Sequence, residues 1–304
     1  MATANDFGPI VEAVELEKSF DATAAVKGIS FTIEAGSCIG LLGPNGAGKT
    51  TTMRMIMGLT RPTGGSLHVF GLPAAQLDRA SRARIGLVPQ ENTLDPELPV
   101  RRNLDLYGRY YGMAPERIAA RVEELLGFMQ LEGKAEARVN ELSGGMKRRL
   151  VIARALIDDP DLIILDEPTT GLDPQARVLI WRQLQTLGAA GKTLLLTTHY
   201  MDEAERLCDR IIVVDSGRVL DEDSPAGLVA RHVKGHVIEI AKPLPTSVDL
   251  ASLPSEDLGN AVLVYTADVD ALLGRLPADA SFTHRRANLE DVFLRLTGRQ
   301  LREA

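Results

Sequence analysis

A glycine-rich segment that ends in lysine and threonine is the part of the chain best suited to hold phosphate. The segment reads Gly43, Pro44, Asn45, Gly46, Ala47, Gly48, Lys49, Thr50 and Thr51. Its spacing matches the phosphate-loop pattern, in which glycines let backbone N–H groups form a nest around an anion. We expect Lys49 to neutralise the β- and γ-phosphates of a nucleoside triphosphate, and the Thr50 hydroxyl to ligate Mg2+.

Two adjacent acids follow an apolar stretch and are the second chemical feature. Leu162–Leu165 has the length of a buried strand, and Asp166 and Glu167 come directly after it. We expect Asp166 to reach the magnesium, directly or through water. Glu167 would then lie near the attacking water, where a positioned general base contributes roughly 10²–10⁴ in rate. Taken alone, the segment is equally consistent with a turn bearing two solvated acids.

A third feature is a serine followed by two glycines. Ser143, Gly144 and Gly145 precede a helical segment, and serine is a favoured residue at a helix N-terminus. Because the glycines leave backbone N–H groups uncovered, this position is a second candidate anion site. The alternative is a capped helix that binds nothing.

The elements around these motifs indicate an α/β fold with a mostly parallel sheet. Residues 10–34 alternate apolar and polar side chains, as strands do, and the later short uncharged runs are also strand-like. The segments between them have helical composition, as expected when parallel strands alternate with helices. The strand candidates are Val11–Leu16, Ile29–Ile33, Cys38–Leu42, Leu162–Leu165, Leu194–Thr197 and Ile211–Val214, and Thr50–Met57 is a helix candidate.

We expect the chain to divide into a first domain over residues 1–225, with a helical subdomain at about 92–157, and a small α+β domain over 226–304. The character of the sequence changes around Asp221–Pro225. The second part contains strand candidates at Val237–Ile240 and Ala261–Tyr265, and helix candidates at Thr266–Leu276 and Asn288–Leu296.

Composition excludes several classes of protein. The formal net charge of −7 over 304 residues argues against a general nucleic-acid binder. The two cysteines, Cys38 and Cys208, have no partner at metal-ligand spacing, and a disulfide framework is not expected. We find no signal pattern and no run of roughly 20 apolar residues that would span a bilayer. If this protein serves a membrane, another polypeptide does the spanning.

With Gln90 and His199 added, the set of motifs resembles the nucleotide-binding subunits of ATP-binding-cassette (ABC) transporters, from about Val11 to Asp223. The resemblance implies a phosphate-loop NTPase core with a helical subdomain. It also implies a head-to-tail homodimer, in which the phosphate loop of one subunit and the Ser143 motif of the other close on each of two ATP molecules.

The resemblance also assigns roles to single residues. Gln90 would contact magnesium and water and respond to the membrane partner, and His199 would contact the γ-phosphate. Asp173 matches a loop that communicates across the dimer. Phe20 stands where the family places an aromatic ring under the adenine, although a core phenylalanine is the alternative.

A narrower resemblance points to the nodulation and drug-resistance exporter group of the type-2 ABC exporters. It is carried by residues 107–110, 141–155, 166–174 and 197–210 and by the tail over 289–298. In this group the permease is a separate chain, so the resemblance implies an exporter ATPase on the cytoplasmic face of an inner membrane. The implied cargo is amphipathic, a lipo-chitooligosaccharide, another lipid or a drug-like molecule. We expect Asn92–Tyr111 to contact the permease, or else only to cover the sheet.

Two other functions stay open. One is an ABC ATPase that acts on ribosomes or DNA, and the other is a regulatory subunit that binds ATP without turnover. The single cassette argues against the first, and the intact Asp166, Glu167 and His199 argue against the second. The basic cluster Lys147–Arg149 is expected to solvate the outer face of its helix or to meet nearby acids, and not to bind nucleic acid.

Overall fold

A computed structural model describes residues 8–233, 235–243, 253–277 and 280–298. The chain divides into two compact units, Met1–Leu220 and Asp221–Ala304. This division falls shortly before the boundary expected after residue 225. The α/β fold class expected from the sequence is confirmed, with a mostly parallel sheet in the first unit.

The main sheet of the first unit orders its strands β10-β9-β3-β8-β7-β6. Its strands are β3 (Cys38–Leu42), β6 (Ile85–Val88), β7 (Leu162–Asp166), β8 (Thr193–Thr198), β9 (Arg210–Asp215) and β10 (Arg218–Asp223). The pairs β3–β8, β3–β9, β6–β7 and β7–β8 are all parallel. Strands distant in sequence are therefore neighbours, and their carboxyl ends meet at one edge of the sheet.

A second, antiparallel sheet orders its strands β2-β1-β4-β5. It consists of β1 (Val11–Phe20), β2 (Thr23–Ile33), β4 (Gly64–Val69) and β5 (Leu72–Pro73). Buried side chains of β1 and β2 join those of β3 and helix α1 (Lys49–Ile56) in one apolar core, which includes Val11, Ile33, Leu41 and Met53. This core fixes the loop between β3 and α1 against both sheets.

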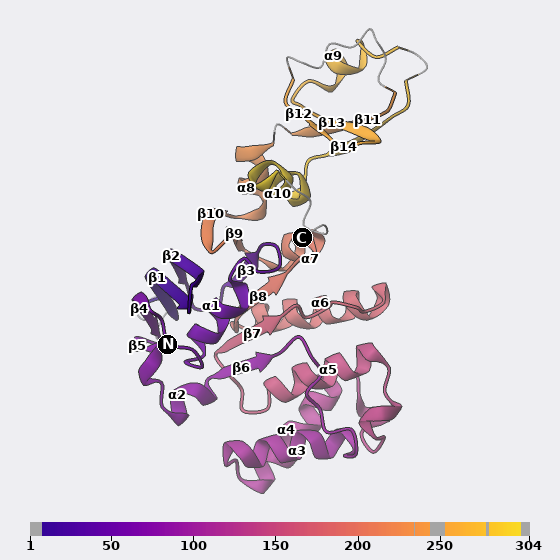
Figure 1. The fold of residues 1–304 in the computed structure, drawn as a ribbon. Helices are drawn as coiled ribbons and strands as arrows, with labels where there is room; N and C mark the ends of the chain where they lie inside the picture. The colour runs from indigo at the N-terminus through magenta and orange to yellow at the C-terminus, as the bar shows by residue number, and fades with distance from the viewer. Residues whose placement is uncertain (1–7, 234, 244–252, 278–279, 299–304) are drawn as a thin grey trace. The chain divides into compact units, whose positions relative to one another are not determined.

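Helices of the first unit fall into two groups (Figure 1). A helical region between β6 and β7 contains α3 (Val100–Tyr111), α4 (Pro115–Phe128) and α5 (Gly144–Ala155), and α3 packs on α4. The others are α1, α2 (Arg79–Ala83), α6 (Pro174–Ala189) and α7 (Met201–Leu207). Helix α5 is apolar on most of its surface after Arg149, and Leu150–Ala153 are all fully buried.

The described residues of the second unit form an antiparallel sheet, β12-β13-β11-β14, and helices α8, α9 and α10. Its elements are α8 (Pro225–His232), β11 (His236–Ala241), β12 (Ser255–Asp257), β13 (Ala261–Thr266), α9 (Val269–Leu273), β14 (Phe282–Arg286) and α10 (Leu289–Thr297). Ile238, Ile240, Val264 and Leu272 form its core. The helix expected over Thr266–Leu276 is shorter, because Thr266 still pairs with His236 in the sheet.

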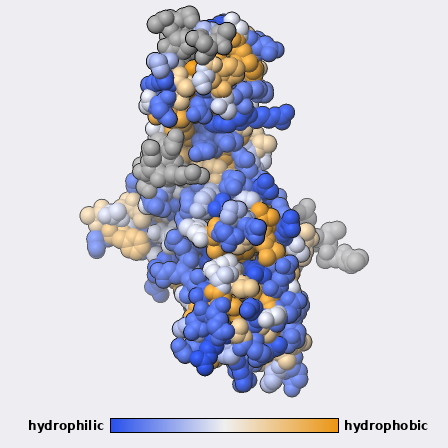
Figure 2. All heavy atoms as spheres, turned by 90° about the vertical axis from the view of Figure 1, so that its right-hand side faces the viewer, coloured by the Kyte–Doolittle hydropathy of each residue, from blue (hydrophilic) through white to orange (hydrophobic). Residues whose placement is uncertain are grey.

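Within the ranges that the structure describes, none of the helices combines the length and the apolar character needed to cross a bilayer. The face drawn in Figure 2 is mainly hydrophilic, with apolar residues in small groups. Cys38 and Cys208 are both buried and free.

Candidate nucleotide-binding site

Four strand ends bring most of the predicted site residues to one edge of the main sheet. The phosphate loop follows β3, His199 follows β8, Glu167 follows β7, and Gln90 lies just beyond β6. These strands are neighbours in the order β3-β8-β7-β6. Open α/β sheets bind ligands at the carboxyl ends of their strands, so this edge is where a nucleotide is expected.

The phosphate loop is closed on itself by its lysine. The Lys49 ammonium donates to the carbonyl oxygens of Gly43 at 2.7 Å and Pro44 at 2.9 Å. Two of its three N–H donors are thus used to shape the loop. Burial lowers the pKa of Lys49, and the carboxylates of Glu167 and Asp166 oppose that lowering.

Glycine is required where the loop meets helix α1. Gly48 has φ +103°, a conformation that side-chain-bearing residues rarely adopt. A β-carbon there would lie 2.6 Å from the carbonyl oxygen of Ala25 on β2. The loop is therefore pressed against the antiparallel sheet, and α1 begins with its N-terminal N–H groups beside it.

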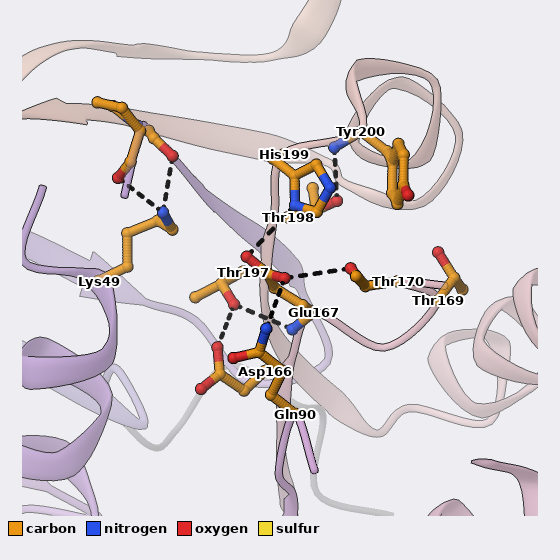
Figure 3. Close-up of polar contacts among 12 residues, drawn as sticks. Lys49, Gln90, Asp166, Glu167, Thr169, Thr170, Thr197, Thr198, His199 and Tyr200 are labelled. Atoms are coloured by element: carbon orange, nitrogen blue, oxygen red, sulfur yellow. Dashed lines mark hydrogen bonds and ion pairs between the residues drawn. The ribbon is translucent and has the colours of Figure 1, made fainter. Parts of the chain in front are cut away.

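The Glu167 carboxylate is the centre of the polar contacts at this edge (Figure 3). Its Oε2 accepts from Gln90 Nε2 at 3.1 Å and from Thr170 Oγ1 at 3.1 Å. Its Oε1 lies 3.3 Å from His199 Nδ1. The structure therefore brings Gln90, Glu167 and His199, three residues predicted from separate motifs, into direct contact.

The same contacts keep Glu167 ionised. Its pKa is lowered from the ordinary value of 4.5, chiefly by the hydrogen bond to His199, although partial burial opposes the shift. The residue also has φ +46°, a left-handed conformation that is uncommon outside glycine. Its backbone N–H donates to Thr197 Oγ1 at 3.1 Å, which helps to hold this conformation.

Asp166 is oriented by the neighbouring strand. Asp166 and Thr197 are register partners of β7 and β8, and Thr197 Oγ1 donates to Asp166 Oδ1 at 2.7 Å. The second carboxylate oxygen of Asp166 carries no such bond to Thr197. The carboxylate therefore lies fixed at the sheet edge with an oxygen directed away from the strand.

The donor set at this edge suits Mg2+ bound together with phosphate. Thr50 is exposed at the start of α1 and Asp166 supplies a carboxylate. Gln90 contacts Glu167 through its side-chain amide nitrogen, so its side-chain amide oxygen can serve as a ligand. These are hard oxygen ligands, which Mg2+ prefers while keeping waters and phosphate oxygens in its shell. Over the described ranges, no group of three or more His, Cys, Asp or Glu side chains is placed to hold a metal alone.

The Ser143 motif lies at the start of a different helix, α5. The Ser143 hydroxyl caps it by accepting from Met146 N at 3.3 Å. Asp173 likewise caps α6, accepting from Ala176 N at 2.9 Å. No hydrogen bond or ion pair among the described residues joins Ser143–Gly145 to the phosphate loop. The contact of this motif with a nucleotide stays a prediction.

Phe20 lies at the end of β1 with 49% of its surface exposed, so it is not a core residue. It pairs with Thr23 of β2, and the following residues of that strand approach the phosphate loop at Gly48. Lys18 Nζ lies 4.9 Å from the centre of its ring. Stacking of this ring on adenine remains a prediction.

The expectation that the basic cluster solvates its helix or meets nearby acids was wrong for Arg148 and Arg149. Arg148 and Arg149 are 4% and 9% exposed, and they donate to main-chain carbonyl oxygens, not to solvent or acids. A sequence signal existed, because the residues from Leu150 to Ile157 are apolar around most of the helix. A helix that is apolar all round is buried, together with any charge it carries.

Two hydroxyl residues of the site were also missed. Thr197 and Thr170 contact the two acids directly, yet they were not assigned a role from the sequence. The available signal was weak: Thr197 lies at the end of an apolar strand, two positions before His199.

Comparisons with known proteins agree with this geometry. Residues 26–170 match the ABC transporter family, and residues 249–298 match the C-terminal domain of the nodulation factor export protein NodI. The chain is 51% identical to the Nod factor export ATP-binding protein I of Paraburkholderia xenovorans, over 96% of this chain and 98% of that protein. It is 49% identical to the protein of the same name from Rhizobium sp. strain N33, with the same coverage.

Solved structures of ABC transporter ATP-binding proteins are also similar to this chain over about 70% of its length. A dimeric ATP-binding cassette in a post-hydrolysis state, bound to ADP and Pi, is 30% identical with a TM-score of 0.64, covering 70% of this chain and 98% of that one. The protein cbiO1 of Clostridium perfringens, part of the ABC transporter complex cbiONQ, is 30% identical with a TM-score of 0.68, covering 73% and 91%. The chain therefore belongs to the ATP-binding subunits of ABC transporters, and it is an ATPase that uses ATP with Mg2+.

Proposed function

We propose that this ATPase powers the export of an amphipathic molecule through a permease encoded as a separate chain. The contact of Gln90, Glu167 and His199 beside the phosphate loop is the observation that carries the proposal, because it assembles the groups that hydrolysis needs. The relatives named as Nod factor export proteins support export and a cargo of the lipo-chitooligosaccharide class. Such a subunit works on the cytoplasmic side of the inner membrane, attached through the permease.

Glu167 is the proposed general base. Its lowered pKa leaves it as a carboxylate at neutral pH, ready to accept a proton from the attacking water. Gln90 and His199 keep the carboxylate in place, and His199 also faces the position expected for the γ-phosphate. Lys49, in the phosphate loop, would neutralise phosphate charge. Thr50, Gln90 and Asp166 would hold Mg2+, which would supply further neutralisation of the phosphate oxygens.

The working unit is a homodimer that shares two ATP molecules. Ser143 is exposed at the N-terminus of α5, and no hydrogen bond or ion pair among the described residues joins it to the phosphate loop of its own chain, so we infer that its anion-binding groups serve a second copy. ATP that contacts both copies favours the closed pair, and hydrolysis removes that preference. This difference in affinity is what can do work on a permease.

The substitution Glu167→Gln tests the proposed function. It keeps the shape of the side chain and removes the base, so turnover should fall by roughly 10²–10⁴ while ATP binding persists. Size-exclusion chromatography with ATP should then show a stable dimer. Glu116→Gln, at the exposed start of α4, is the matched control and should hydrolyse normally. Turnover near the wild-type rate in Glu167→Gln would refute the role of Glu167.

A groove on the helical region is the proposed contact with the permease. It has a volume of about 410 Å³ and is lined by residues 93–96, Asn103, Leu106, Tyr107 and Tyr110. The two tyrosine rings lie 5.6 Å apart, and Tyr110 is 62% exposed. The groove begins three residues after Gln90, so a permease segment seated in it would lie next to the catalytic edge. It falls within the expected range Asn92–Tyr111.

Introducing a charge tests this contact. Tyr110→Glu should abolish co-purification with a co-expressed permease of this exporter group. Leu59→Glu is the matched control, because Leu59 is a similarly exposed apolar residue outside the groove. Equal recovery of the permease with Tyr110→Glu and with wild type would count against the groove. A chain that instead co-purifies with ribosomes or DNA would favour the alternative function.

A further inference from the structure

Arg148 is a buried cation whose partners are all backbone carbonyl groups. It lies on α5 with 4% of its surface exposed. Its guanidinium donates to the carbonyl oxygens of Pro89, Gln90, Asp166, Glu167 and Pro168. No carboxylate accepts from it in the described chain. Burial lowers its pKa to about 10, which still leaves it charged at neutral pH.

These carbonyl groups belong to two different loops. Nη1 donates to the loop after β6, at 3.3 Å to Gln90 and also to Pro89. Nη2 donates to the end of β7 and the loop that follows it, at 2.9 Å to the carbonyl oxygen of Asp166 and 3.1 Å to that of Glu167. A guanidinium is planar and its donors diverge in a fixed fork. One side chain therefore sets the separation of the two loops.

Arg148 binds the backbone carbonyl groups of Gln90 and Glu167, and the side chains of these two residues contact each other. Gln90 Nε2 lies 3.1 Å from Glu167 Oε2. Glu167 is moreover held at φ +46°, a strained conformation that persists only where its surroundings enforce it. Arg148 binds the carbonyl of Glu167 while Thr197 binds its N–H, so the strained residue is held from both sides.

A second arginine of α5 secures the same loop further along. Arg154 Nη2 donates to Thr93 Oγ1 at 2.6 Å, and its Nη1 donates to the Thr93 carbonyl. The segment from Pro89 to Thr93 is thus fastened to one helix at both ends. The position of Gln90 is consequently determined by α5 as well as by its own strand.

We propose that Arg148 is a positioning residue for ATP hydrolysis. From α5 it holds the backbones of Gln90 and Glu167 at the separation that lets the amide orient the carboxylate. The inference rests on the proposed role of Glu167. Arg148 itself does not touch the nucleotide, so its loss should impair turnover and leave ATP binding in place.

The neighbouring residue offers a matched control. Arg149 is also buried, and it also donates to carbonyl oxygens, those of Met129 and Gln130 at the end of α4. Arg148→Lys and Arg149→Lys remove similar buried contacts, so both should lower the unfolding temperature. Only Arg148→Lys should lower kcat, by about 10²-fold for a misplacement near 1 Å, at unchanged ATP affinity measured by titration. If Arg148→Lys does not fold, Arg148→Gln replaces it, because glutamine keeps two N–H donors without the charge. Arg148→Gln should also lower kcat at unchanged ATP affinity.

Amide hydrogen exchange provides a readout independent of turnover. Residues 88–91 and 165–169 should exchange faster in Arg148→Lys than in Arg149→Lys. Equal kcat and equal exchange in the two variants would overturn the inference. Faster exchange in both loops, combined with full turnover in Glu167→Gln, would refute the base role of Glu167 and still support the bracing by Arg148.

Discussion

Replacing Gly145 with alanine should destabilise the first unit, whereas the same change at Gly144 should not. A β-carbon at Gly145 would lie 2.6 Å from Cβ of Ala176 on α6, closer than two carbon atoms can approach. At Gly144 the nearest atom would be Cδ2 of Leu172 at 3.9 Å, an ordinary contact. The two positions are adjacent in one helix turn, so each serves as the control for the other.

The expected sizes follow from these distances. Adding a methyl group where none fits costs about 1–3 kcal/mol, because α5 and α6 must move apart. Where the methyl fits, Gly→Ala stabilises by about 0.4–1 kcal/mol, since the unfolded chain loses freedom. For a domain of this size 1 kcal/mol shifts the unfolding temperature by about 2–4 °C. Gly145→Ala should therefore unfold about 3–16 °C below Gly144→Ala.

Intrinsic fluorescence during heating measures this difference in the right unit. Trp181 is the single tryptophan of the chain and lies on α6, 6% exposed, in the helix that Gly145 contacts. Nucleotide should be left out, because a ligand that binds only the folded state raises the unfolding temperature. If Gly145→Ala unfolds at or above the temperature of Gly144→Ala, the close packing of α5 on α6 is refuted.

Three other predictions concern the nucleotide site. The hydrogen bond from His199 is the main cause of the lowered pKa of Glu167, so the rate of single-turnover hydrolysis should fall only below pH 4.5 on the acid side. In His199→Ala this fall should occur at higher pH, and acid limbs at the same pH in the variant and the wild type would contradict the prediction. Because the pKa of Glu167 is lowered in the folded state, its contact with His199 stabilises the fold fully above pH 4.5, and this stabilisation is lost as the pH falls through the lowered pKa. Lys49→Ala should weaken ATP binding, and an unchanged affinity in a titration would argue against the loop. Ser143→Arg should block dimer closure, so mixing it with wild-type subunits should reduce activity, and undiminished activity would disprove a shared site.

Much of the catalytic edge was predictable because its signals are local. Each of these motifs can be recognised from a few consecutive residues: the glycine loop, the apolar strand that ends in Asp166 and the strand that ends shortly before His199. Buried parallel strands are short and uncharged, so β3, β7, β8 and β9 were expected close to their observed bounds. Edge strands of the second unit were missed, since β14 is mostly exposed and is defined by pairing with β11.

What only the tertiary structure decided is which distant groups meet. The contact of Gln90 with Glu167 joins residues 77 positions apart, and it depends on β6 and β7 being neighbours in the sheet. The apolar residues after Arg149 indicated that Arg148 is buried, but its acceptors could not be predicted, because they are carbonyl oxygens, which every residue carries. The local sequence does not show that backbone carbonyl groups take the place of water around a buried charge, because the fold alone brings these groups to it. Side-chain types therefore told us which chemistry was present, and strand order and helix packing determined how it is held together.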